Sequence, residues 1–305
     1  MDEFTRADLC PTIYEVMAQS CPMTGVKAED LSGTLQRTYG TELVYAVLSK
    51  ELGVCLSTVL HLNYQKRNNS CRLFDEEIIK TCPPTDNWEI NILLSRIDEG
   101  YHISILLINH KLMQVEYFEP NGSASWTFAC GKTLREWAQQ HYKDYFFIFP
   151  EDVCPVGPQA VLGEGTCWLW SSLYFYLRVR CPDADPGILI ESLLTMEKSE
   201  LNDLVTRFGC YLMETGNKLH LDVVTPLYFS AQKILRNDIF DPTIAEFSQR
   251  LERYYLTAQL KALTNTILSS DELVFQIDPQ LIRHAELIMA STNGGGASAA
   301  AAAAR

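Results

Sequence analysis

The sequence of 305 residues lacks the features that mark a membrane-spanning or zinc-binding protein. Its longest purely aliphatic run is Ile105–Ile108, and its richest apolar stretch, 167–179, contains two serines and falls short of the about 18 residues that a membrane span needs. None of its ten cysteines forms a C-x-x-C pair, so a structural zinc site has little support. The N-terminal segment MDEFTRADL is acidic and has no apolar core, so we expect no secretory signal.

Positive charge is also scarce. Lysine and arginine number 25 against 38 aspartates and glutamates, which gives a formal net charge of −13. Proteins that bind nucleic acid regardless of its sequence, or dock on anionic membranes, need cations for the phosphates. We therefore expect no nucleic-acid partner and no membrane partner.

The overall composition is that of an ordinary globular protein. Apolar residues make up 47% and charged residues 21%, and a chain of this length can bury a sizeable core without cross-links. In the absence of a secretory signal, the ten cysteines are expected to be thiols in a reducing intracellular compartment. Most of them are expected to be small core residues.

Hydrophobic periodicity divides the chain into a polar lead-in, a helix, a group of strands and a run of helices. Residues 1–30 are predicted to be loosely ordered, and 34–52 to form a helix for which Gly53 is a suitable C-terminal cap. Short segments rich in Ile, Leu and Val then predict strands. The expected strands are 55–64, 73–80, 89–98, 101–109, 112–118 and 145–149, and the expected helices are 133–142, 167–180, two within 187–215, 226–236 and 243–269.

This order of elements predicts an α+β fold. We expect one main domain over 31–225, with a central, mostly antiparallel sheet and a buried helix over 167–180. A helical C-terminal extension is expected over 226–290, and the alanine- and glycine-rich residues 291–305 form a low-complexity tail.

A histidine and a glutamate are expected to meet across a β-hairpin. If the strands 101–109 and 112–118 are joined by a two-residue turn at 110–111, His102 and Glu119 are directly opposed, with Cβ atoms about 4.5–5.5 Å apart. The carboxylate would then fix the tautomer of the imidazole and stabilise its protonated form. A register slip of one residue would separate the two side chains. Taken alone, His102 is better explained as a polar strand end, and Glu119 as the start of a turn.

Two further residues carry possible chemistry. Cys167 follows the glycine-containing segment Gly163–Thr166 and begins a helix that is apolar on nearly every side. The free N–H groups and the dipole at a helix start favour a thiolate, and the same N–H groups can bind an oxyanion. Gln159 follows Gly157-Pro158 in a predicted loop whose backbone these two residues restrict, and its amide can act there as an oxyanion donor.

Taken together, His102, Glu119, Gln159 and Cys167 resemble the superfamily of SUMO-specific proteases and the adenovirus maturation protease. The segments Tyr-Phe-Glu-Pro-Asn-Gly and Gly-Thr-Cys-Trp-Leu-Trp-Ser-Ser-Leu-Tyr-Phe-Tyr-Leu-Arg are closer still to the protease-like proteins of nucleocytoplasmic large DNA viruses. The resemblance covers about residues 88–182.

The resemblance implies a papain-like cysteine-protease core in circularly permuted chain order, with histidine first and cysteine last. By position, Cys167 is the nucleophile, His102 the general base and acid, and Glu119 the residue that orients His102. Gln159 and the backbone N–H of Cys167 form the oxyanion hole. No metal or organic cofactor is implied. The implied substrate is a protein, either a ubiquitin-like conjugate or a viral structural protein. The protease itself is expected in the host cytoplasm or nucleus, or packaged in a virion if it is viral.

Three residues depart from the family pattern. Ile103 stands where SUMO proteases carry a tryptophan beside the histidine, which puts a Gly-Gly preference in doubt. Gln159 precedes Cys167 by eight residues, a slightly longer spacing than in those proteases. Trp168 is bulky and is expected to narrow the cleft.

Two other functions stay open from sequence. The chain can be a catalytically silent protease fold that serves as a binding module or virion scaffold. A weaker alternative is a Cys/His/Glu acyltransferase, although the sequence contains no P-loop or dense basic cluster for a phosphorylated acyl donor.

Overall fold

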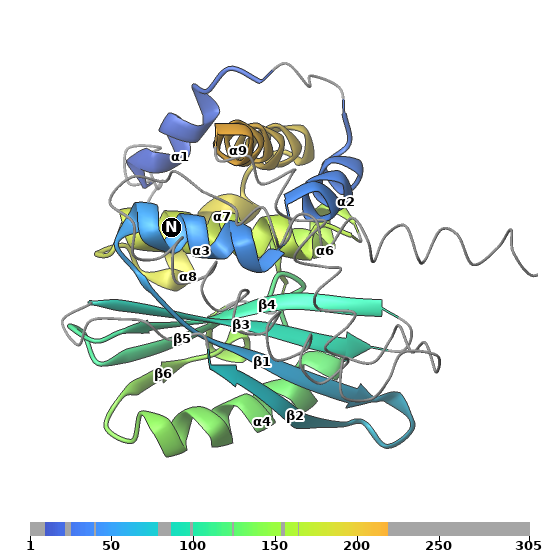
Figure 1. Cartoon of the computed structure of the whole chain (residues 1–305), viewed down its shortest axis with the longest axis vertical. Helices are drawn as coiled ribbons and strands as arrows, with labels where there is room; N and C mark the ends of the chain where they lie inside the picture. The colour runs from blue at the N-terminus through green and yellow to red at the C-terminus, as the bar shows by residue number, and fades with distance from the viewer. Residues whose placement is uncertain are drawn as a thin grey trace, which may run out of the picture.

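The computed structural model of the chain describes residues 10–21, 26–39, 41–78, 87–97, 100–123, 125–153, 156–163 and 165–218. They form an α+β fold in which a curved sheet lies between a layer of helices and a single helix on its other face (Figure 1). The predicted helices at 226–236 and 243–269 and the tail 291–305 lie outside the described residues, as does the end of the proposed domain at 225.

The sheet has six strands in the order β2-β1-β3-β4-β5-β6. The pairs β1–β2, β3–β4 and β4–β5 are antiparallel, whereas β1–β3 and β5–β6 are parallel. Three of the five strand pairs are antiparallel, as expected, and the sheet is mixed because β1 pairs with β3, and β5 with β6, in parallel. The strands are β1 (Cys55–Gln65), β2 (Ser70–Ile78), β3 (Trp88–Ile97), β4 (Gly100–Asn109), β5 (Gln114–Phe118) and β6 (Phe146–Ile148), with the 3-10 turn η2 (Lys66–Asn68) between β1 and β2.

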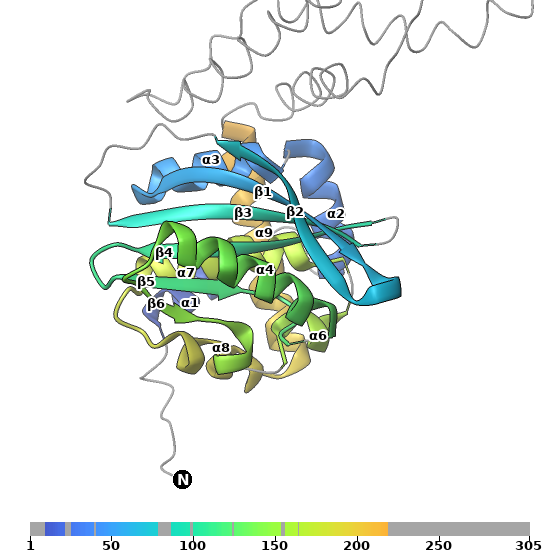
Figure 2. The ribbon, with the colours of Figure 1, turned by 90° about the horizontal axis from the view of Figure 1, so that it is seen from below.

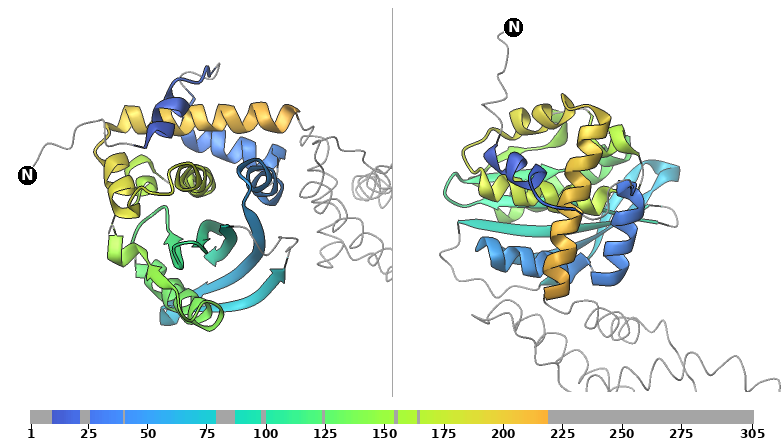
Figure 3. Two further views of the ribbon diagram at one scale, coloured as in Figure 1. Left: turned by 90° about the vertical axis from the view of Figure 1, so that its left-hand side faces the viewer. Right: turned by 90° about the horizontal axis from the view of Figure 1, so that it is seen from above.

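Two hydrophobic cores form on opposite faces of this sheet. The larger core packs α7 (Cys167–Arg180) against β3 and β4, and the smaller one packs α4 (Ser125–His141) against the other face (Figures 1 and 2). The helices α1 (Pro11–Met17), α2 (Ala28–Tyr39), α3 (Thr41–Leu52) and α9 (Lys198–Lys218) lie on the α7 side (Figure 3). The shorter helices are α5 (Pro150–Val153), α6 (Pro158–Leu162) and α8 (Pro186–Leu194).

Helix α7 is confirmed with the predicted bounds, and it is buried along most of its length because its side chains are apolar all round. A buried ion pair ties it to the sheet. Arg178 donates to both carboxylate oxygens of Glu116 on β5, at 2.8 and 2.6 Å, and to the carbonyl oxygens of Cys181 and Ala184. Tyr174 donates a further hydrogen bond to Glu116, so the buried carboxylate is well satisfied.

The predicted helix at 34–52 is two helices, α2 and α3. Apolar spacing continues across their junction, so periodicity alone did not reveal the break. Gly53 has a positive φ of 67°, as a C-terminal cap requires. Helix α4 begins eight residues earlier than predicted. In the described part of the chain, no helix is long and apolar enough to cross a membrane.

The prediction that residues 1–30 are loosely ordered is wrong for the segment from Cys10 to Cys21. Residues 11–17 form α1, which starts at Pro11 and buries Ile13 and Val16 in the larger core. Disulfides hold this segment at both ends, to residues that lie at least 171 positions away in the sequence.

The expectation of free thiols is likewise wrong for most of the described cysteines. Disulfides join Cys10 to Cys181, Cys21 to Cys210 and Cys71 to Cys130, with Cα atoms 6.0, 5.6 and 4.9 Å apart. Cys55 is also disulfide-bonded. Partners separated by 59 to 189 residues cannot be paired from local spacing. The expectation of thiols in a reducing compartment was drawn from the acidic N-terminal segment, and disulfides are rare in such a compartment.

Candidate active site

The hairpin that carries His102 has a different register from the predicted one. Asn109 pairs with Gln114, which leaves a four-residue turn instead of a two-residue turn. The side chain of Asn109 accepts a hydrogen bond from the backbone N–H of Leu112, and Met113 takes a positive φ of 50°. The register is shifted by two positions. Because side chains alternate between faces with a period of two, the shift changes which residues are opposed but preserves their face.

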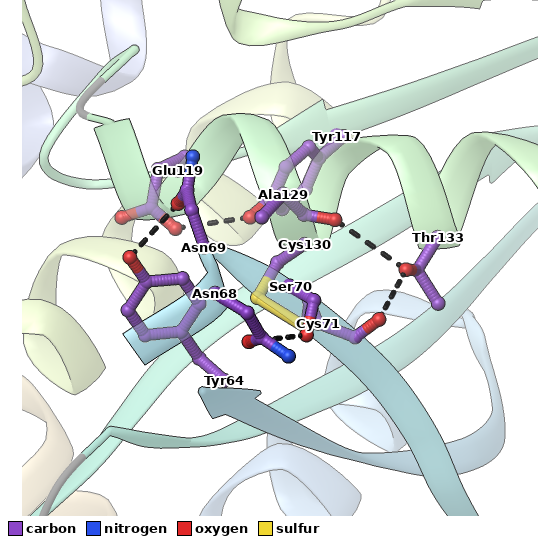
Figure 4. The surroundings of a disulfide bond; sticks show 10 residues. All are labelled: Tyr64, Asn68, Asn69, Ser70, Cys71, Tyr117, Glu119, Ala129, Cys130 and Thr133. Carbon is purple, nitrogen blue, oxygen red and sulfur yellow. Dashed lines mark hydrogen bonds between the residues drawn. A yellow bond between two sulfur atoms is a disulfide. The ribbon is translucent and has the colours of Figure 1, made fainter. Parts of the chain in front are cut away.

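His102 and Glu119 therefore still meet, as diagonal rather than directly opposed neighbours. The Nε2 atom of His102 and the Oε1 atom of Glu119 are 2.7 Å apart, and both residues are buried. The Tyr117 hydroxyl donates to Oε2 of Glu119 at 3.0 Å, and the Asn121 backbone N–H donates to Oε1 at 3.1 Å. The carboxylate is thus held from both sides. Figure 4 shows Glu119 and Tyr117 near the Cys71–Cys130 disulfide, which fixes β2 to α4 beside them.

Cys167 is the first residue of α7, as predicted, and it is a free thiol among the described cysteines. The chain reaches it through Gly163 and Gly165, whose φ values of +119° and +84° favour glycine. The preceding residue, Thr166, makes no side-chain bond to the first N–H groups of the helix. Those donors therefore remain available at the helix start.

The Cys167 thiol contacts strand β4 directly. The interactions that lower the pKa of the thiol come from the His102 side chain and from the backbone of Ile103. Ser171, one turn further along α7, donates to the Ile103 carbonyl at 3.2 Å and fixes the helix on the strand. Since Glu119 engages Nε2 of His102, the Nδ1 atom is the one left for the sulfur.

The two ionisable groups shift each other toward a thiolate and an imidazolium. Burial raises the pKa of Cys167, but the hydrogen bond and charge of His102 and the Ile103 backbone outweigh it, so the pKa lies below its ordinary value of 9.0. Burial lowers the pKa of His102, but the Glu119 charge and the bonds to Cys167 and Glu119 raise it overall to about 10. Both shifts favour a Cys167 thiolate paired with a His102 imidazolium.

Gln159 lies on the short helix α6 and is 4% exposed. Its backbone N–H donates to the Pro120 carbonyl at 2.9 Å, so the turn after Glu119 positions it. A side chain at Gly157 would collide with Pro120 and Gly122, so glycine is required for this close approach. The Oε1 atom of Gln159 accepts no hydrogen bond from the described residues. Among the described residues, no hydrogen bond joins Gln159 to Cys167. The role of Gln159 in the oxyanion hole therefore stays a prediction.

For two aromatic residues near Cys167, the prediction from sequence was wrong or absent. Trp168 is 1% exposed and belongs to the larger core, so the prediction that it narrows the cleft is wrong. The Trp168 side chain is buried in the core and does not line a cleft. Tyr45 on α3 is fully buried, and sequence reasoning missed it. Burial raises the pKa of its hydroxyl, and the nearby charge of Cys167 adds to that rise.

A cavity of about 540 Å³ opens on the N-terminal side of α7. Thr166, the residue before Cys167, lines it together with residues from α6 and from the starts of α2 and α9, including Lys27 and Lys198. It is large enough for a side chain of a bound polypeptide. In the described residues, no group of three or more His, Cys, Asp or Glu side chains is placed to hold a metal ion.

Comparison with known proteins adds little to this geometry. No protein-family model and no curated protein matches the sequence. Among solved structures, the crystal structure of the Legionella pneumophila effector protein RavZ aligns with 90% of this chain and 94% of its own, at 13% identity and a TM-score of 0.31. So low a score carries no argument. The family resemblance inferred from the motifs therefore stays a prediction.

Proposed function

We propose that the protein is a cysteine peptidase that hydrolyses a peptide or isopeptide bond through a thioester. The observation that supports it is the continuous chain from the Cys167 thiol through His102 to the buried Glu119 carboxylate. This arrangement lowers the pKa of a thiol at the start of a buried helix. A nucleophile, a base and a group that orients the base are the parts needed for covalent catalysis.

The reaction follows from these positions. The Cys167 thiolate attacks the carbonyl carbon, and the electron pair of the C=O bond moves onto oxygen. The N–H groups at the start of α7 and the Gln159 amide are the proposed donors to that oxyanion. When the C–N bond breaks, protonated His102 gives its proton to the leaving amine. His102 then takes a proton from water, whose oxygen attacks the thioester and releases the acid and the thiolate.

The proposed architecture is a papain-like core in permuted order, in which the histidine precedes the cysteine along the chain. The mixed sheet with a buried helix bearing the cysteine supports this proposal. The substrate is proposed to be a protein, and both a ubiquitin-like conjugate and a viral structural protein remain candidates. The cavity beside Thr166 is a candidate subsite.

The place of action is a separate proposal. Disulfides persist in oxidising environments and are rare in the cytosol. Three of them in the described residues favour a chain that matures under oxidising conditions over one that stays reduced. Counting free thiols by mass after maleimide treatment of the unfolded, unreduced protein decides between the two states.

The proposed function is tested with a peptide-based thiol probe and a matched pair of histidine variants. We expect the probe to label Cys167 of the wild type. Labelling should disappear in Cys167→Ala and fall sharply in His102→Ala. His110, at the other end of the same hairpin, also pairs with a glutamate, at 3.2 Å from Glu89, but lies away from the thiol. His110→Ala should label normally. Equal labelling of the wild type and Cys167→Ala would end the proposal.

A further inference from the structure

A row of paired residues, three of them exposed, crosses four strands at the end of the sheet that carries His102. The strand registers pair Arg72 of β2 with Asn63 of β1, Asn63 with Arg96 of β3, and Arg96 with Tyr101 of β4. Paired residues on neighbouring strands share a face, and strands lie about 4.8 Å apart. The row therefore spans about 14 Å and ends at the residue next to His102.

This row lies on the face of the sheet that α7 covers. Tyr101 shares its side of β4 with Ile103, and Arg96 shares its side of β3 with Ile92, because side chains two positions apart point the same way. Both Ile103 and Ile92 are buried in the core beneath α7. The row therefore lies on the same face of the sheet, just beyond the first residue of α7. At that point Cys167 interacts with the backbone of Ile103.

Two of the four side chains of the row are basic, and Asn63 between them is half-buried. Arg72 and Arg96 are exposed, and neither forms an ion pair with a carboxylate in the described part of the chain. Two exposed aromatic side chains flank them, Phe74 on β2 at 60% and Tyr101 at 62%. A chain with a net charge of −13 thus presents cations and apolar rings beside its nucleophile.

We propose that Arg72 and Arg96 select substrates that carry an acidic segment next to the scissile bond. This inference rests on the proposed peptidase function and adds the substrate class. The two guanidinium groups bind carboxylates of an extended polypeptide laid across the strand ends, and Phe74 and Tyr101 pack against its apolar atoms. The acidic bulk surface repels such a segment elsewhere, so the row also fixes where it binds.

The test uses internally quenched peptide mixtures in which each of four positions on either side of the scissile bond is fixed in turn as Asp, Ser or Lys. The wild type is expected to cleave mixtures with Asp at neighbouring positions faster than those with Ser or Lys. An exposed ion pair changes binding by about 1.5- to 5-fold. The double variant Arg72→Gln/Arg96→Gln should therefore lose roughly 2- to 25-fold in kcat/KM on the Asp mixtures and little on the Ser mixtures.

The control is a double variant with the same loss of charge at the far end of the hairpin. Lys111 lies in the β4–β5 turn and Lys143 between α4 and β6, and both are exposed. Lys111→Gln/Lys143→Gln should keep the full preference for Asp. The preference of the wild type should also shrink as salt rises from 50 to about 500 mM, because salt screens exposed charges.

The outcomes separate the inference from the function on which it rests. Selective alkylation of Cys167 by iodoacetamide with equal cleavage of Asp, Ser and Lys mixtures contradicts the inference alone. An Asp preference that survives in Arg72→Gln/Arg96→Gln contradicts it too, because other groups must then bind the acid. A protein whose Cys167 is not selectively alkylated and that cleaves no mixture contradicts the proposed function and the inference with it.

Discussion

Replacing Glu119 with glutamine tests how the site activates its thiol. Glutamine keeps the size of the side chain and can still bond the ring of His102, but it removes the negative charge 2.7 Å from Nε2. With the amide oxygen in the Oε1 position, the Asn121 backbone N–H can still donate to it, and the amide NH2 in the Oε2 position can donate to the Tyr117 hydroxyl. The substitution therefore changes the charge with little change in packing.

The size of the effect follows from the geometry. At 2.7 Å and an effective dielectric constant of about 20, the attraction between Glu119 and protonated His102 is about 6 kcal/mol, which corresponds to about 4 pKa units. Burial alone lowers the pKa of His102, so its pKa should fall from about 10 to its ordinary value of 6.5 or below. At pH 7.5 no more than about a tenth of the rings would then be protonated.

The assay is the rate at which iodoacetamide alkylates Cys167 at pH 7.5, followed by mass spectrometry. In Glu119→Gln the thiolate loses most of its protonated partner, so alkylation should slow by at least about tenfold. Tyr117→Phe is the matched control, because it removes one hydrogen bond to the same carboxylate and should slow alkylation by no more than about fivefold. Equal rates for the wild type and Glu119→Gln would refute the reasoning.

Three further substitutions or treatments test the surrounding structure. Arg178→Ala leaves the Glu116 carboxylate buried without its cation, so the free energy of unfolding in urea should fall by about 3–5 kcal/mol, and an unchanged midpoint would contradict this. Gly157→Ala places a Cβ against the Pro120 carbonyl and should displace Gln159. We expect kcat to fall by more than about tenfold. An unchanged kcat would show that the position of Gln159 does not matter for catalysis. Reduction of the disulfides should lower the melting temperature clearly, since closing loops of about 100 residues stabilises a fold by up to about 5 kcal/mol each; an identical melting curve with dithiothreitol would show that they contribute nothing.

The sequence predicted those parts of the site that depend on short-range patterns. The apolar run after Gly165 predicted helix α7 with Cys167 as its first residue. Both features follow from the local composition of the sequence. The contact between His102 and Glu119 was predicted correctly although the predicted register of the β4–β5 hairpin was wrong. The register error was an even number of residues, so it kept both side chains on one face of the sheet. An error of one residue would have removed the contact.

The features that the sequence did not reveal depend on distant parts of the chain. The turn at Asn109 was longer than predicted because its side chain bonds the backbone three residues on, which residue spacing does not show. The burial of Tyr45 behind α7 joins residues more than 120 positions apart. The disulfides did leave a signal, an abundance of cysteine, but the acidic N-terminal segment led to the expectation of free thiols instead.

The most direct test of the ion pair is the pH dependence of Cys167 alkylation by iodoacetamide in the wild type and in His102→Ala. Because its pKa is lowered, the wild-type thiol should stay reactive below pH 9 and should lose reactivity at a lower pH than the thiol of His102→Ala. In His102→Ala the burial of the thiol acts without its partner, so reactivity should rise only near or above pH 9. Coincident profiles for the two proteins, both rising near pH 9, would contradict a thiolate held by His102.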